Sequence, residues 1–448
     1  MRVALCSTYD LGRQPFGLAE PAAWLRRAGF PVACHDLARE PKGEAALATA
    51  DLVAFHLPMH TATRLAVAVA RRLRAARAGL PLLFYGLYAP RCAATLEALA
   101  PPVVVIGGEV EQALVEAVTG LAAGAAPPSP RTLLERLTLL TPDRRDLPPL
   151  ACYPALRLPD GSARVVGYTE ASRGCKHRCR HCPVVPVYDG RVRLIDAAVV
   201  GADIAQQVAA GAQHITFGDP DFFNAPDHAL AIARNLAAAH PGLTFDATIK
   251  VSHLLAHPRA VAELAACGCL FITSAFESFE ATVLDRLAKQ HTVADLAAAV
   301  AVGRRVGVTI TPTFVPFTPW TTLAGVVALF EQVAALDLVA AVAPVQYTLR
   351  LLLPPGSLLL DDPACARLAG PLDEGALVHP WRHPQPALDR LQRRLTEAVV
   401  AGSRAGFSRP LLYARLRALV EEAAGRGGSE PVRQARTAVP FLEEPWFC

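Results

Sequence analysis

Three cysteines are grouped in the short segment Ser172–Pro183. Cys175, Cys179 and Cys182 follow the spacing C-x3-C-x2-C, so three thiolates lie within eight residues. Thiolates are the usual ligands of iron–sulfur clusters, and three of them can hold three irons of a cubane 4Fe–4S cluster. The fourth iron is then left without a protein ligand, and an open metal position is where a substrate can coordinate. We therefore predict a 4Fe–4S cluster bound by these cysteines.

The alternative metal for this segment is zinc. His177 and His181 stand between the cysteines and could complete a structural zinc site. Structural zinc usually draws its ligands from two separated knuckles, and no second pair follows at a plausible spacing. The sequence favours the cluster, and a zinc-stabilised binding module that uses the N-terminal region for recognition is the non-enzyme alternative.

The cysteine segment directly follows the first of a series of strand patterns. Short apolar runs, typical of buried strands, alternate with Ala-rich helical segments. The runs are Val165–Glu170, His214–Phe217, Thr244–Ile249, Leu270–Ser274, Thr309–Val315 and Pro344–Arg350. Six such units favour a partial (β/α)6 barrel of the TIM type. A barrel carries its chemistry at the C-terminal ends of its strands, which is where the cysteines stand.

Residues 1–121 show an earlier and equally regular alternation. Its five apolar runs are Val3–Cys6, Pro31–His35, Leu52–His56, Pro81–Tyr85 and Pro102–Ile106. The pattern predicts a doubly wound, flavodoxin-like parallel sheet of the α/β class. Residues 122–150 are rich in proline and indicate a linker with one short helix. We expect the barrel to span 151–358 and a helical C-terminal region to span 359–448.

Composition narrows the class of protein. The 448 residues are 52% hydrophobic and 19% charged, which is typical of a compact globular protein. Arginines supply 40 of the 44 basic residues without any basic block, so no nucleic-acid partner is expected. No apolar stretch reaches the roughly 18 residues of a membrane span, and the N-terminus lacks the pattern of a signal peptide. We expect a cytoplasmic protein without a membrane partner.

The cysteine segment resembles the radical S-adenosylmethionine (SAM) superfamily, in which a C-x3-C-x2-C loop binds a 4Fe–4S cluster. In that family the amino and carboxylate groups of SAM chelate the open iron. The resemblance implies that His181, directly before the third cysteine, stands where the family usually carries an aromatic residue beside the adenine. It extends over residues 145–355.

The resemblance also assigns roles to residues at the ends of the later strands. Asp219 and Asp221 resemble the acidic turn that helps to hold the SAM amino group, and a plain solvated turn is the alternative. Lys250 and Ser252 follow the third strand, within reach of the SAM carboxylate or ribose. After the fourth strand, Glu277 and Ser278 resemble residues that border the ribose.

The N-terminal region resembles the cobalamin-binding domain that precedes many radical SAM barrels. The likeness is strongest at Tyr85–Pro90 and Val105–Glu111. Gly107, Gly108 and Glu109 are expected either to meet a nucleotide tail at a helix N-terminus or to form an ordinary tight turn. The D-x-H-x-x-G signature of a lower cobalt ligand is absent after the first strand. Many relatives lack it, so cobalamin remains a candidate cofactor.

This resemblance implies an enzyme that cleaves SAM reductively, normally to methionine and a 5′-deoxyadenosyl radical, and starts radical chemistry on a small molecule. An electron donor of the flavodoxin or ferredoxin type is implied as a partner. Two alternatives within the family are cobalamin-dependent methylation and transfer of a 3-amino-3-carboxypropyl group. No motif identifies the substrate.

The C-terminus suggests a further relationship. The layout resembles a radical SAM group whose tails end in Cys-Cys-Ala-Glu-Pro or Cys-selenocysteine-Ala-Glu-Pro, whereas this chain stops at Cys448. A selenocysteine codon, UGA, read as a stop would truncate the chain at this point. We therefore expect either a selenoprotein, with UGA after the codon for Cys448, or a short apolar tail packed on the barrel. The gene sequence distinguishes the two.

Overall fold

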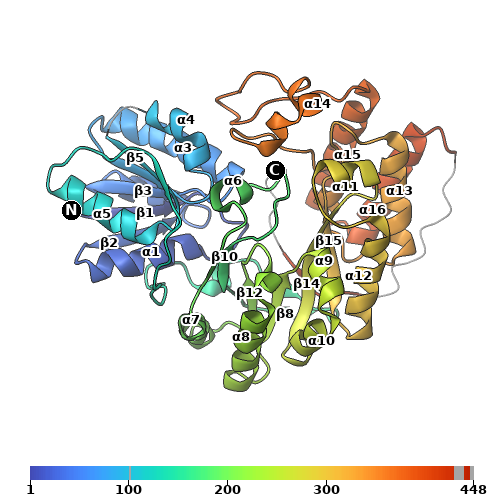
Figure 1. Ribbon diagram of the computed structural model, residues 1–448, viewed down its shortest axis with the longest axis horizontal. Coiled ribbons are helices and arrows are strands. Elements are labelled where there is room, and N and C mark those ends of the chain that lie inside the picture. The colour runs from blue at the N-terminus through green and yellow to red at the C-terminus, as the bar shows by residue number, and fades with distance from the viewer. Residues whose placement is uncertain (100–101, 428–437, 444–448) are drawn as a thin grey trace.

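The computed structural model describes residues 1–99, 102–427 and 438–443. Two α/β units lie side by side, and helices of the C-terminal region pack on the second (Figure 1). The predicted α/β class is confirmed. The C-terminal tail with Cys448 lies outside the described residues, so the selenocysteine hypothesis remains a prediction.

The first unit is a parallel sheet with strand order β2-β1-β3-β4-β5-β6. Its strands are β1 (Val3–Ser7), β2 (Val32–Asp36), β3 (Leu52–His56), β4 (Leu82–Tyr85), β5 (Val103–Gly108) and β6 (Arg131–Leu133). The helices are α1 (Phe16–Arg27), α2 (Glu44–Leu47), α3 (His60–Ala76), α4 (Ala93–Glu97) and α5 (Glu111–Ala122). The five predicted strands are confirmed. The apolar runs of β1, β3, β4 and β5 are largely buried on both faces of the sheet, whereas β2 is a half-buried edge strand.

The sixth strand, β6, corrects the interpretation of 122–150 as a linker. β6 pairs with the end of β5, where Gly108 lies opposite Leu133. Gly108 has a positive φ of 77°, and a Cβ there would lie 1.9 Å from the Leu133 carbonyl oxygen. A Cβ on Gly107 would lie 2.5 Å from the Pro90 ring. Both glycines are therefore required by packing within the sheet, as in the tight-turn alternative.

The predicted short helix in 122–150 is absent, since residues 134–149 form no helix. Arg144 fixes this stretch instead. Its guanidinium donates two hydrogen bonds to Asp203, of 2.7 and 2.8 Å, and one of 2.7 Å to the Tyr168 carbonyl. Paired, charge-assisted donors to a buried carboxylate are strong hydrogen bonds, so they hold this stretch in place without a helix.

The second unit is a parallel sheet of five strands in the order β15-β14-β13-β12-β9. The strands are β9 (Val166–Thr169), β12 (His214–Phe217), β13 (Thr244–Thr248), β14 (Cys269–Glu277) and β15 (Thr309–Phe314). The helices are α7 (Ala197–Ala209), α8 (Pro226–Ala239), α9 (Val251–Ala256), α10 (Pro258–Ala266), α11 (Ala281–Arg286), α12 (Val293–Arg305) and α13 (Leu323–Ala335). The apolar side chains between sheet and helices form the largest core of the molecule.

The prediction of a sixth barrel strand over Pro344–Arg350 is wrong. Pro344–Tyr347 form a single 3-10 turn, and an isolated bridge joins Arg350 to Phe317. The Gln346 side chain accepts a 2.9 Å hydrogen bond from the Phe314 backbone N–H. This side chain therefore satisfies an edge position of β15 that a sixth strand would otherwise fill.

The cysteine loop connects the two strands of a small hairpin that lies between the two units. Its strands are β10 (Ser172–Gly174) and β11 (Val192–Leu194), which pair antiparallel, and the short helix α6 (Val185–Tyr188) lies between them. Asp219, directly after β12, accepts hydrogen bonds from the Ser172 hydroxyl and the Ala171 N–H. This carboxylate fixes the corner at which the chain leaves the barrel for the loop.

The C-terminal region is mainly helical, with α14 (Pro363–Ala366), α15 (Pro386–Arg404) and α16 (Arg409–Ala423). α16 packs against α13, and the Tyr413 hydroxyl donates to the Phe330 carbonyl. A three-stranded sheet of β7 (Leu156–Arg157), β8 (Ala163–Arg164) and β16 (Phe441–Leu442) lies beside the barrel. No helix in the described part of the chain is long and apolar enough to cross a membrane.

One guanidinium joins the two units. Arg173, in β10, is 13% exposed and lies among four carboxylates. Glu111 is 2.7 Å away, Glu170 3.3 Å, Glu109 3.4 Å and Glu20 3.9 Å. Burial raises the pKa of Glu170 to about 7, although the Arg173 charge opposes the shift. The cluster therefore depends on Arg173 for charge balance.

We expect Arg173→Gln to destabilise the fold by about 3–5 kcal/mol at pH 8, because carboxylates remain buried without their cation. A carboxyl group whose pKa is raised by folding stabilises the folded state at pH values below its unfolded-state pKa. This contribution is lost as the pH rises through the folded-state pKa. The loss in the free energy of unfolding caused by Arg173→Gln should therefore be smaller at pH 6 than at pH 8. Urea unfolding at both pH values measures it.

The matched control is Arg178→Gln. Arg178 pairs with Asp189 at 3.2 Å, but both side chains are 65% exposed, so the unfolding midpoint should stay unchanged. Equal destabilisation of Arg173→Gln at pH 6 and pH 8 would contradict the assigned charge balance.

Candidate active site around the cysteine loop

The three cysteines lie on the loop between β10 and α6. Cys179 is buried, while Cys175 and Cys182 are half-buried against the apolar side chains of α6. The Cys182 N–H donates to the Cys179 carbonyl at 3.1 Å, and the Arg180 N–H donates to the Leu287 carbonyl at 3.0 Å. The loop is therefore fixed both internally and against the end of α11.

The loop geometry does not suit a zinc ion. A Zn–S distance of about 2.3 Å places tetrahedral sulfurs about 3.8 Å apart. Within the described ranges, the one group of three potential ligand atoms lying within 4.8 Å of one another contains none of these thiols. His177 and His181 contact carboxylates outside the loop, so they do not complete a zinc site together with the cysteines. A cubane cluster spreads its thiolates over three irons, so it does not require all three sulfurs around one ion.

The charge environment also suits a thiolate-bound cluster. Burial raises the pKa of Cys182 to about 11 and also raises the pKa of Cys175. Lys289 and Lys250 oppose these shifts, because their ammonium groups favour the thiolates. Both lysines are nearly buried, at 3% and 7% exposure. Two cations beside the loop would offset the negative charge of a bound cluster.

Glu277, at the end of β14, connects the loop to the barrel. Its Oε1 lies 3.0 Å from the Lys289 Nζ and 3.1 Å from the His181 Nε2. Burial acts to raise the pKa of Glu277, but the charges of Lys289 and His181 outweigh it and hold this pKa well below its usual range. Glu277 also has a positive φ of 65°. A strained, ionised residue at a strand end is typical of functional sites.

Other predicted site residues surround this group. Lys250 directly precedes α9, and its Nζ lies 3.4 Å from the Gln290 side-chain oxygen. The Ser252 Oγ and the His181 Nδ1 are buried without a hydrogen-bond partner. Ser278 differs, since its Oγ accepts from the Glu280 N–H at 3.0 Å. Unpartnered buried polar atoms are rare, so these atoms fit a polar ligand such as SAM.

The two predicted aspartates have different surroundings. Asp219 accepts a hydrogen bond from the corner of the loop, and burial raises its pKa to about 6. Asp221 is 2% exposed and lies against His177 and His253. Neither is a solvated turn residue, which was the alternative prediction.

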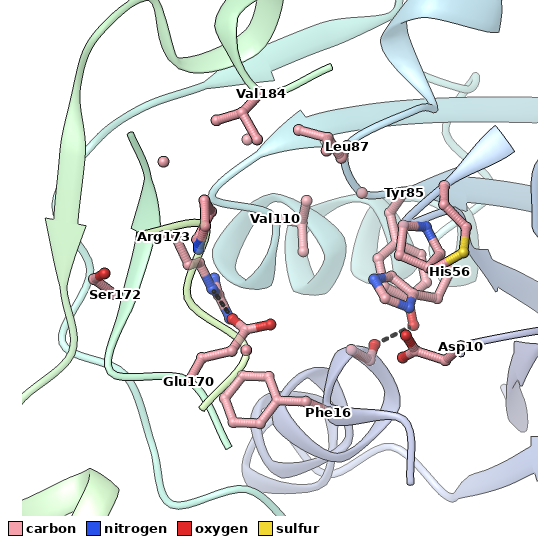
Figure 2. A pocket seen from close by; sticks show the side chains of 18 of the residues that line it. Asp10, Phe16, His56, Tyr85, Leu87, Val110, Glu170, Ser172, Arg173 and Val184 are labelled. Atoms are coloured by element: carbon pink, nitrogen blue, oxygen red, sulfur yellow. Dashed lines mark hydrogen bonds and ion pairs between the residues drawn. The ribbon is translucent and has the colours of Figure 1, made fainter. Parts of the chain in front are cut away.

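A cavity of about 260 Å³ lies between the N-terminal sheet and the loop. Figure 2 shows His56, Tyr85 and Asp10 on the sheet side and Glu170 and Arg173 on the barrel side. It lies at the C-terminal edge of the sheet, next to the switch in strand order between β1 and β3. Open α/β sheets bind their ligands at such points.

His56 in this cavity is a residue that sequence reasoning missed. Its ring fills the space beside Gly17, where a Cβ would lie 2.2 Å from the imidazole. Burial lowers the pKa of His56 to about 3, and its Nδ1 has no hydrogen-bond partner. The ring is therefore neutral at physiological pH. The sequence did carry a signal for this residue, because a histidine ends a buried strand at the C-terminal edge of the sheet, where ligands bind.

A second cavity, of about 330 Å³, occupies the barrel interior. Thr216, Asp246, Thr248, Thr273, Thr311 and Thr313 contribute polar groups to its lining. Asp246 accepts at Oδ1 from the Thr216 hydroxyl at 2.6 Å, and the His214 Nε2 lies 2.9 Å from the same oxygen. This network orients a buried carboxylate in a cavity large enough for a small molecule.

We expect Glu277→Gln to destabilise the protein by about 3 kcal/mol, because Lys289 would remain buried without its counter-charge. The double variant Glu277→Gln/Lys289→Met should lose less free energy of unfolding than the two single variants lose together. The coupling energy should be at least about 1 kcal/mol. Urea unfolding of all three variants tests this.

The matched control is Glu422→Gln, at the exposed Glu422–Arg394 pair, which should leave the midpoint unchanged. Additive losses in the double variant would show that Glu277 and Lys289 do not act as a pair.

The comparisons with known proteins agree with this geometry. Residues 169–329 match the family model described as the radical SAM superfamily. No curated protein sequence matches the chain.

Among solved structures, the fold resembles the radical S-adenosylmethionine methyltransferase TsrM from Kitasatospora setae. That match has 18% identity, 75% coverage of this chain, 72% coverage of that chain and a TM-score of 0.58. It also resembles the cobalamin-dependent S-adenosylmethionine radical enzyme OxsB, with 12% identity, 94% and 71% coverage and a TM-score of 0.72.

The family match begins at the last residue of β9 and ends inside α13. It therefore includes the cysteine loop and the strand ends that surround it. The fold likeness to OxsB extends over both α/β units, since it covers 94% of the chain. The protein thus carries a radical SAM domain, in an architecture shared with cobalamin-dependent radical SAM enzymes.

Proposed function

We propose that this protein is a radical SAM enzyme that cleaves SAM reductively to start radical chemistry on a small molecule. Cys175, Cys179 and Cys182 would hold a 4Fe–4S cluster. The observation that carries the proposal is the position of this loop. It lies at the C-terminal ends of the barrel strands, beside two nearly buried lysines and two unpartnered polar atoms.

A reduced cluster supplies the electron that breaks a carbon–sulfur bond of SAM. This chain's part is to hold SAM and exclude water. We assign SAM contacts to His181, Lys250 and Ser252, with Glu277 and Ser278 beside them. Asp219 and Asp221 would act indirectly, since one holds the corner of the loop and the other lies against its histidine.

The barrel cavity is the proposed substrate site. Its threonine hydroxyls and the Asp246 carboxylate favour a small polar molecule over an apolar one. The electron would come from a flavodoxin- or ferredoxin-type donor, and the reaction would take place in the cytoplasm. We keep residues 1–121, 151–358 and 359–448 as the proposed domains, with 122–150 joined to the first sheet through β6.

Replacing any one of the three loop cysteines by alanine should abolish a SAM-responsive reduced cluster, because two thiolates cannot hold three irons. Iron analysis and electron paramagnetic resonance of anaerobically reconstituted protein measure the loss. Cys267→Ala is the matched control, since Cys267 ends α10 away from the loop, and its cluster should be intact. A normal signal in all three loop variants would refute the assignment.

Incubation of the reduced, reconstituted protein with SAM should yield 5′-deoxyadenosine. Chromatography of the products distinguishes the alternatives, because methylation yields S-adenosylhomocysteine and transfer of a 3-amino-3-carboxypropyl group yields 5′-methylthioadenosine. The loop-cysteine variants should form none of these. If the wild-type protein also forms none, the proposed function fails.

A cobalamin-dependent reaction is the second candidate. The cavity between the sheet and the loop favours it, since its position suits a cofactor that faces the cluster. Solved structures of TsrM and OxsB contain cobalamin. The size of the cavity argues against it, because 260 Å³ is below the range for drug-sized ligands and a corrinoid is larger still. A corrinoid would therefore lie only partly inside this cavity.

Gel filtration after incubation with hydroxocobalamin tests this candidate. A corrinoid retained at one per chain would support it and would require the cavity to widen. Passage of the protein without corrinoid would leave the cavity to a smaller molecule and exclude the second candidate.

A further inference from the structure

Two histidines and an aspartate from three separate elements meet beside the cysteine loop. His177 belongs to the loop, Asp221 follows β12, and His253 lies in α9. One potential ligand atom from each of the three lies within 4.8 Å of the other two. The group contains no cysteine, and the cluster proposed above does not use it.

The distances from the Asp221 carboxylate to the two histidines are compatible with ligands around one ion. The His253 Nδ1 lies 2.7 Å and the His177 Nε2 3.5 Å from the Asp221 Oδ2, and the two histidines approach to 3.3 Å between their Nε2 atoms. Metal–ligand distances of about 2.0–2.1 Å place the ligands of a tetrahedral ion about 3.3 Å apart. The two separations from the Asp221 Oδ2 lie on either side of that value, and the 3.3 Å contact shows that the two imidazole rings approach each other.

The closest contact in the group joins two deeply buried atoms at ion-pair distance. The Asp221 Oδ2 and the His253 Nδ1 are 2.7 Å apart, yet both atoms are buried without a hydrogen-bond partner. The two side chains are only 2% and 8% exposed, so water does not easily satisfy them. A carboxylate buried between two imidazole rings is costly unless positive charge compensates it. A cation would satisfy the two atoms at once.

We propose that His177, Asp221 and His253 form a binding site for a divalent transition-metal ion, separate from the cysteine cluster. Imidazole and carboxylate ligands suit Zn²⁺ or Fe²⁺, and a fourth position stays open to water. The ion would tie the cysteine loop to the end of β12 and to α9. The opposing charge is Lys250, whose Nζ is directed to Gln290 and whose backbone N–H lies 3.5 Å from the Asp221 Oδ1.

The first test uses the full-length chain with all three loop cysteines replaced by serine, so that no cluster forms. Titration with Co²⁺ should give visible d–d absorption that saturates at one ion per chain. Adding His253→Ala or Asp221→Asn should weaken binding at least about tenfold, the loss that even an indirect partner of a metal ligand causes. His257→Ala, four residues beyond His253, is the matched control and should bind as before. Unchanged binding in the His253 and Asp221 variants overturns the proposal.

The second test uses the cluster-loaded protein, so that it remains decisive if the serine variant does not fold. Elemental analysis should find one zinc per chain beyond the cluster iron after exposure to Zn²⁺, and none in His253→Ala. The zinc content should not change when SAM is added. Displacement of zinc by SAM would overturn the proposal, because Asp221 would then belong to the SAM site. Both readouts are independent of SAM cleavage, so they distinguish this site from the proposed function.

Discussion

The position of the cysteine loop depends on one guanidinium. Arg173 lies one residue before the glycine that ends β10, and it contacts carboxylates from both units. Glu20 and Glu111 are each 1% exposed, so their charge cannot be left to solvent. A cation shared in this way holds the N-terminal sheet against the base of the loop. The loop is therefore oriented by both units rather than by the barrel alone.

Around the loop, buried charged groups depend on partners that the fold must bring near. Glu277 neutralises Lys289 and contacts His181, and Asp219 fixes the corner before β10. Such groups are costly when unpaired, so the site forms only when β10, β12 and β14 are all in place. The Ser252 Oγ and the His181 Nδ1 are among the buried atoms that are left unpartnered here. The network therefore closes around a space suited to a polar ligand.

Much of the fold and the position of the cysteine loop could be predicted from the sequence, for physical reasons. Strands buried on both faces appear as apolar runs. The three cysteines stand within one short segment, so their spacing can be read directly from the sequence. Contacts between distant segments leave no such signal. Three-residue β6 is too short for a periodic pattern, and the side chain of Gln346 replaces a predicted strand by satisfying Phe314. The pairing of Glu277 with His181 likewise joins residues 96 positions apart.

The two cavities are neighbours rather than separate sites. Both are lined by Leu11, Arg13, Gly218 and Pro220. Gly218 cannot carry a side chain, because a Cβ there would lie 1.8 Å from the Tyr168 hydroxyl. The Arg13 guanidinium lies over the same tyrosine ring, 5.1 Å from its centre. The wall between the cavities is thus built from the first sheet and from the turn that carries Asp219. A molecule bound in one cavity would contact the elements that orient the other, so the N-terminal unit takes part in forming the site even without a cofactor of its own.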